Sequence, residues 1–149
     1  MRSWVGVLVV SMVVGMVSGC GGDSDSSSQA LSKKAFVKQG NAICVEGVKE
    51  KDQILDAGLK KLSQTGTEPP KRDVEELILK ILPPLEETTE QLGELQPPSG
   101  DEKVVNGFMQ EWEEALQKAE AEPGSAISPR FLLTPNLKAK EYGLTSCSL

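Results

Sequence analysis

The chain of 149 residues carries 16 basic and 22 acidic side chains and no histidine, so its formal charge is −6 at neutral pH. An acidic chain lacks the basic surface that nucleic acids require, which argues against that class of partner. The lack of histidine excludes Ser-His and Cys-His catalytic pairs and most catalytic zinc sites, and the sequence has no phosphate-binding glycine loop. We therefore expect no enzyme, no cofactor and no metal site.

The first 20 residues have the features of an export signal. Met1–Ser3 contains one positive charge, and Trp4–Val17 is almost wholly apolar. This run is shorter than the roughly 20 residues of a membrane-spanning helix, and Ser18, Gly19 and Cys20 follow it. The order resembles the lipobox of bacterial lipoproteins, in which the cysteine is lipidated and becomes the mature N-terminus. The alternatives are an uncleaved anchor, or a secreted protein with a chance cysteine.

The lipobox divides the chain into three parts. Residues 1–19 are the predicted signal peptide, residues 20–30 hold the lipidated Cys20 and a flexible linker, and residues 31–149 form the folded domain. Removal of residues 1–19 takes away one arginine and makes the side-chain charge −7. Two acyl chains, such as palmitate, give stable anchoring where one gives only marginal binding. We therefore expect a lipid-anchored protein at the extracytoplasmic face of the cell membrane.

The chain contains three cysteines. Once Cys20 is assigned to lipid, Cys44 and Cys147 remain. Thiols outside the cytoplasm tend to oxidise, and an even number of them in an exported chain is typical of a disulfide. The bond would close a loop of about 100 residues, which stabilises by roughly 4.7 kcal/mol in the chain-entropy model. Two free buried thiols or an intermolecular bridge are the alternatives to this predicted intrachain disulfide.

The first helix is predicted over 32–64, where apolar residues recur at spacings of three, four and seven. Ser32 can cap its N-terminus. Gly40 and Gly47 lie on the flank of the apolar stripe, where close packing of a neighbouring element is a reason for glycine. A proline pair at 69–70 ends the element.

The second helix is predicted from Lys71 or Asp73 to Leu95, on a face of leucine, isoleucine and valine. Pro83-Pro84 lies inside this pattern. Because proline lacks an amide hydrogen and clashes with the preceding turn, we expect a kink or a break at this point.

The third helix is predicted over 101–121 and has the strongest amphipathic pattern in the chain. Its apolar face consists of Val104, Val105, Phe108, Met109, Trp112, Leu116 and Ala119. Phe108 and Trp112 could line a ligand pocket. Aromatic residues one turn apart on an apolar helix face are more often core, and we expect core here.

The last element is predicted as a short turn near 131–132 followed by a helix over 135–142. Gly143, followed by an apolar residue, predicts a Schellman stop, after which the chain folds back to bring Cys147 to Cys44. Helices joined by proline- and glycine-rich turns, without alternating strand patterns, predict an all-α fold. The architecture we expect is a small antiparallel four-helix bundle.

Acidic residues form two clusters. Glu86, Glu90 and Glu94 share one face of the second helix, where a cation site and a solvated surface are the two interpretations. We favour the solvated surface, because calcium needs clustered oxygens on an irregular backbone. The acidic residues of 111–114 are interpreted in the same way. No pair of carboxylates stands out as the centre of a glycoside hydrolase.

Lysines follow the predicted linker directly. Lys33, Lys34 and Lys38 lie in the first two turns of the first helix. Two interpretations are equally compatible with them. They could contact anionic lipid headgroups, or they could be an ordinary charged helix start.

Several short segments between residues 31 and 149 carry a resemblance. They are Leu31-Ser32-Lys33, Phe36-Val37, Ala42-Ile43-Cys44, Leu95 through Glu102, and Tyr142-Gly143-Leu144 with Cys147. They resemble an uncharacterised family of small helical lipoproteins from high-GC Gram-positive bacteria, whose two cysteines correspond to Cys44 and Cys147. The family often has an acidic residue where this chain has Ala35, and aspartate where it has Asn41. The resemblance implies fold and location, and it implies no activity.

These observations favour a non-enzymatic helical module that binds a partner or ligand at the cell envelope. The alternative is a carrier of a small apolar ligand in the bundle core, and a hydrolase is less favoured. A continuous pocket beside Trp112 would favour the carrier. A wide exposed apolar patch would favour a protein partner.

Overall fold

The computed structural model describes residues 30–64, 66 and 68–149. The predicted signal peptide, Cys20 and the linker up to residue 29 lie outside the described residues. The described chain forms four α-helices and one short 3₁₀ helix, and no strand. In chain order these are α1 (Lys33–Ser63), α2 (Lys71–Gly93), α3 (Glu102–Ala121), η1 (Pro123–Ile127) and α4 (Leu133–Tyr142). The all-α prediction is confirmed.

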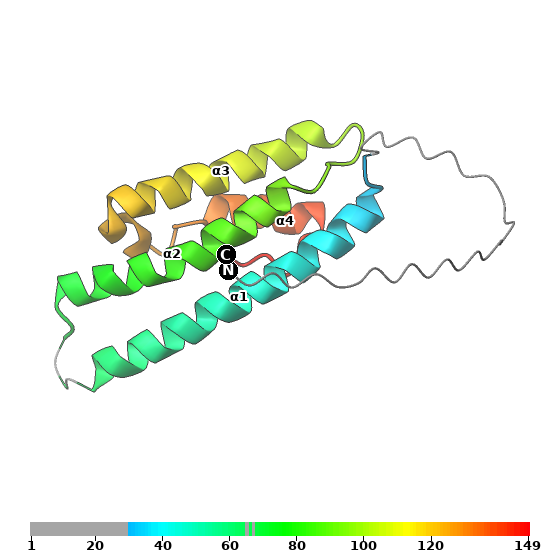
Figure 1. Cartoon of the computed structure of the whole chain (residues 1–149). Helices are drawn as coiled ribbons and strands as arrows, with labels where there is room; N and C mark the ends of the chain where they lie inside the picture. Colours follow the sequence, from blue (N-terminus) through cyan, green and yellow to red (C-terminus); the bar gives the residue numbers. More distant parts are fainter. Residues whose placement is uncertain (1–29, 65, 67) are drawn as a thin grey trace, which may run out of the picture.

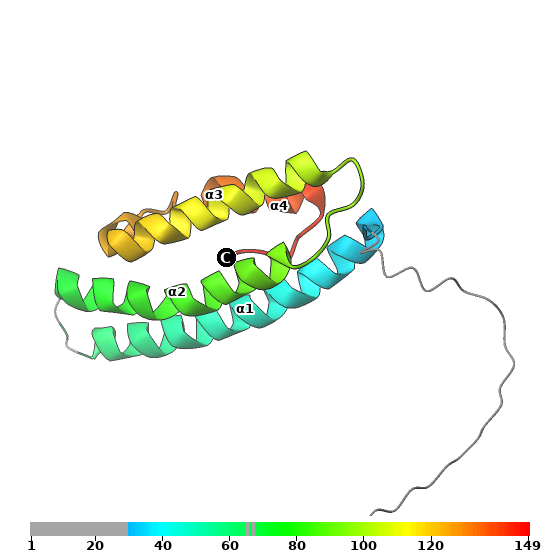
Figure 2. The same cartoon turned by 45° about the horizontal axis from the view of Figure 1, so that its top comes forward.

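Successive helices run in opposite directions and form two layers (Figures 1 and 2). α1 and α2 pack side by side as one hairpin, α3 packs on α2, and α4 runs back along α3. The segment after α4 returns between the two layers. The predicted antiparallel four-helix bundle is confirmed, with a C-terminal segment added to its centre.

α1 is buried along its first half only. Ser32 caps this helix by accepting a hydrogen bond from the Ala35 amide at 3.2 Å, as predicted. The buried residues of α1 are Phe36, Gly40, Cys44 and Gly47. A side chain at Gly47 would overlap the Thr88 hydroxyl group of α2, and one at Gly40 would overlap a leucine of the C-terminal segment. Close packing therefore explains both glycines, as the sequence indicated.

We expected a kink or a break at Pro83-Pro84, and the structure rules out the break, because α2 is continuous through both prolines. A proline inside a helix removes a backbone hydrogen bond and costs about 3 kcal/mol. Packing outweighs this cost, because eight residues of α2 are buried while the helix packs against α1, α3 and η1. Pro84 is itself buried, and its carbonyl accepts a hydrogen bond from the Thr88 hydroxyl at 2.6 Å. Tertiary packing thus overrides a local sequence rule.

The apolar face of α3 forms the centre of the core. Phe108 and Trp112 are fully buried, with ring centroids 5.3 Å apart in an edge-to-face arrangement. The other buried residues of α3 are Val105, Met109, Leu116 and Ala119. Val104, which the pattern also included, is exposed. The interpretation of Phe108 and Trp112 as core residues is confirmed.

The chain after α3 differs from the prediction in detail. The 3₁₀ helix η1 was not predicted, and α4 begins at Leu133, two residues earlier than expected. Leu132 has a φ of 59°, and burial of its side chain offsets a conformation that leucine rarely adopts. The Schellman stop is confirmed, because Gly143 has a φ of 123° and the Leu144 amide donates to the Ala139 carbonyl at 2.9 Å.

Candidate functional site

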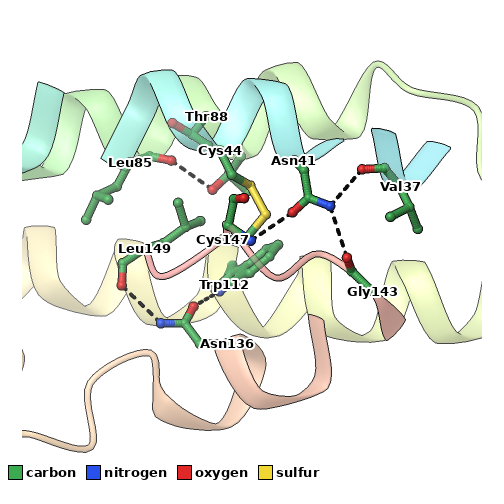
Figure 3. The surroundings of a disulfide bond; sticks show 12 residues. Val37, Asn41, Cys44, Leu85, Thr88, Trp112, Asn136, Gly143, Cys147 and Leu149 are labelled. Atoms are coloured by element: carbon green, nitrogen blue, oxygen red, sulfur yellow. Dashed lines mark hydrogen bonds between the residues drawn. A yellow bond between two sulfur atoms is a disulfide. The ribbon is translucent and has the colours of Figure 1, made fainter. Parts of the chain in front are cut away.

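Cys44 on α1 and Cys147 in the C-terminal segment form a disulfide (Figure 3). Their Cα atoms lie 4.9 Å apart, which is within the usual range, and both residues are almost fully buried. The bond joins positions 103 residues apart in the sequence. The predicted intrachain disulfide is confirmed.

Asn41 holds the same segment one turn before Cys44. Its side-chain amide donates to the carbonyls of Val37 at 2.9 Å and Gly143 at 3.0 Å, and its oxygen accepts from the Ser146 amide at 2.8 Å. An ionised aspartate at this position would have no proton to donate to either carbonyl. Asn41 is therefore a structural clamp. The clamp was not predicted from the sequence, because its partners Gly143 and Ser146 lie more than a hundred residues away.

Asn136 on α4 binds the C-terminal segment from the other layer. Its oxygen accepts from the Trp112 indole NH at 2.7 Å, and its amide donates to the main-chain oxygen of Leu149 at 3.1 Å. Lys51 on α1 donates to the Ser148 carbonyl at 3.0 Å. The polar atom of the tryptophan is thus satisfied inside the bundle, and the region around Trp112 is a packed core.

An apolar groove of about 530 Å³ lies between α1, α2 and η1, and we call it the distal groove. It lies at the end of the bundle opposite the start of α1 (Figure 1). Its lining is mostly aliphatic and includes Leu55, Leu59, Leu62, Ile78, Ile81 and Ile127. Leu59 is 51% exposed and Ile127 is 50% exposed, so the groove is open to solvent at its rim.

The distal groove lies beyond Lys51, the last residue of α1 that hydrogen-bonds to the C-terminal segment. This segment lies along the first half of α1, where all of its buried residues lie. From Val48 to Ser63, α1 has no buried residue, although its apolar stripe continues through Ile54 and Leu59. Exposed apolar surface that is gathered in one place is typical of a binding site.

A second groove, of about 420 Å³, lies at the opposite end of the bundle. Here Lys33 begins α1, Asp101 precedes α3 and Tyr142 ends α4. The Tyr142 hydroxyl donates to Asp101 at 2.8 Å, and the Lys33 amine lies 4.2 Å from the centre of the tyrosine ring. Burial, and secondarily the Asp101 carboxylate, raise the pKa of Tyr142 well above its ordinary value. The phenol therefore stays neutral and joins three elements of the fold.

The acidic clusters lie on the surface. Glu86 and Glu90 on α2, and Glu94 directly after its end, are all exposed, in agreement with a solvated face. Glu111 forms an ion pair with Lys138. Within residues 30–64, 66 and 68–149, no group of metal-ligating side chains is placed to hold an ion, and no helix has the length and apolar character to span a bilayer.

No protein-family model matches the chain, and neither a curated protein nor a solved structure matches it. The resemblance to a lipoprotein family therefore rests on the residues quoted above and stays a prediction. Fold and site together define a disulfide-clamped helical bundle. One end of this bundle has the apolar distal groove, and the other end has the second groove, which contains Lys33, Asp101 and Tyr142.

Asn41→Asp tests the clamp. The carboxylate cannot donate to the Val37 and Gly143 carbonyls, so we expect the free energy of unfolding to fall by about 1–3 kcal/mol in urea denaturation. Gln39→Glu is the matched control, because it makes the same charge change at an exposed position of α1 and should stay within about 0.5 kcal/mol of the parent. Equal effects of the two variants would contradict the assignment.

Tyr142 can be titrated without interference, because it is the single tyrosine of the chain. We expect its ultraviolet tyrosinate signal to appear well above pH 10 in the folded protein and near its ordinary pKa of about 10 in denaturant. Since the folded pKa is raised, the stability from the neutral phenol is complete below about pH 10 and declines above it. Asp101→Asn should lower the pKa. Titration of the folded protein near 10 would refute the contact.

Proposed function

We propose that this protein is a lipoprotein of the cell envelope, anchored through Cys20, whose helical domain is a non-enzymatic binding module. The observation that carries the anchor is the use of the other cysteines. Cys44 and Cys147 are bonded and buried, so Cys20 is the single cysteine left for lipid. It follows directly on an apolar run and two small residues.

The distal groove supports the binding role. It is an open apolar surface, and the rim residues Leu59 and Ile127 are half exposed to solvent. An open surface of this kind suits apolar side chains of another envelope protein. The alternative is a carrier of a small apolar ligand in the bundle core. It has less support, because Trp112 is fully buried and hydrogen-bonded within the core.

Cys20→Ser tests the anchor. We expect the parent protein in the membrane fraction, with the mass of acyl chains added to Cys20, because the thiol is the lipid acceptor. The variant should lack this mass and should not be processed to the mature N-terminus. Ser18→Ala keeps a small residue before the cleavage point and serves as the control. Unchanged processing and retention of Cys20→Ser would contradict the proposal.

A photoreactive residue tests the groove in living cells. A photoreactive amino acid that replaces Leu59 should form one discrete covalent adduct with the bound partner, because Leu59 lines the rim of the distal groove. Val45 is the matched control, since it is also 51% exposed on α1 and does not line the groove. Adduct mass separates a protein partner from a small apolar ligand. Equal labelling from both positions, or none, would argue against a binding surface here.

A further inference from the structure

The start of α1 is basic in a chain that is otherwise acidic. Between residues 31 and 45 the chain has three lysines, Lys33, Lys34 and Lys38, and no acidic side chain. From residue 46 to the last residue, 20 acidic side chains outnumber 12 basic ones. The beginning of the helical domain therefore has the opposite charge from the remainder of the domain.

Helix stability does not explain these lysines. The free amide groups at a helix N-terminus form the positive end of the helix dipole, which favours acidic residues and disfavours lysine. The first turns of α2 and α3 include Asp73 and Glu102, whereas the first turn of α1 contains no acidic residue. The dipole of α1 therefore destabilises the positive charges of Lys33 and Lys34.

The fold brings two further lysines to the same end of the bundle. Lys103 of α3 and Lys138 of α4 line the groove that also contains Lys33 and Tyr142. Asp101 and Glu141 are the acidic residues of this groove. Asp101 lies 3.8 Å from the Lys33 amine, and Lys138 pairs with Glu111.

Three lysines at this end are not neutralised by an ion pair. Lys34, Lys38 and Lys103 are exposed, and none of them pairs with an acidic side chain in the part of the chain that the structure describes. We call Lys33, Lys34, Lys38 and Lys103 the lysine corner. The charges of Lys34, Lys38 and Lys103 are available to an external anion, whereas Lys33 pairs with Asp101.

Three residues of the lysine corner, Lys33, Lys34 and Lys38, are the basic residues of the domain nearest to Cys20 along the chain. The 13 residue steps from Cys20 to Lys33 span at most about 47 Å. Leu59 of the distal groove lies 26 residues farther along α1, which is about 39 Å from Lys33 along the helix axis.

We propose that the lysine corner is a membrane-contacting surface that binds the anionic headgroups of phospholipids. The inference rests on the lipid anchor at Cys20, which keeps the corner close to the bilayer. Each lysine near an anionic membrane strengthens the association about fivefold. Contact at this corner directs the distal groove away from the bilayer, toward partners in the surrounding envelope.

Amine labelling of the mature lipidated protein tests this contact. The protein is placed in phosphatidylcholine vesicles, with or without phosphatidylglycerol, and the labelling rate of each lysine is read by mass spectrometry. We expect the lysine corner to react at least about fivefold more slowly in the anionic vesicles. Lys60 and Lys61 at the far end of α1 should react equally in both. Salt should remove the protection, because it screens exposed charges.

A pair of charge-reversal variants provides a second measurement. Lys34→Glu with Lys38→Glu should speed transfer of the lipoprotein out of anionic vesicles by at least about tenfold and leave transfer from neutral vesicles unchanged. Lys60→Glu with Lys61→Glu is the control of equal charge and should have no such effect.

Each other outcome overturns the proposal. Equal labelling of all lysines in both vesicle types would refute membrane contact, and protection by inorganic phosphate in neutral vesicles would indicate a site for small anions instead. If Cys20 carries no lipid, the outcome can be recognised separately. The protein then lacks the mass of the acyl chains and does not stay on either type of vesicle.

Discussion

The bundle depends on the C-terminal segment 143–149, which lies between its two layers. Leu144, Cys147 and Leu149 of this segment are buried. The disulfide and Asn41 attach the segment to α1, and Asn136 attaches it to α4. The disulfide and the Asn41 hydrogen bonds link residues about a hundred positions apart. They join α1 to the chain after α4, alongside the contacts that Phe36 and Lys33 make with Tyr142.

This arrangement makes the two ends of the molecule physically different. At the end where α1 begins, the C-terminal segment lies between the layers, and Phe36 and Phe108 both contact Tyr142. At the other end the segment is absent, and η1 lies beside α2. The distal groove is found at this end, between α1, α2 and η1.

The two ends also suggest a division of roles. The lysine corner, near the anchor, has charge that suits a lipid surface, while the distal groove has aliphatic side chains that suit an apolar partner. α1 connects the two and separates them by its own length. If the proposed anchor at Cys20 holds the lysine corner at the membrane, the distal groove at the opposite end of α1 is left for a partner.

The sequence by itself determined the helices, because their signals are local: a 3.6-residue apolar period, the Ser32 cap and the Gly143 stop are each confirmed within a few residues. It also predicted the pairing of Cys44 with Cys147, because an even remainder of cysteines in an exported chain is typical of a disulfide, and the structure shows this bond. Only the tertiary structure decided that α2 continues through Pro83, because packing from three neighbours outweighs a local penalty. Only the tertiary structure revealed the clamp at Asn41 and the distal groove. A hydrogen bond between residues 102 positions apart, and a groove between three elements of the fold, leave no periodic pattern in the sequence.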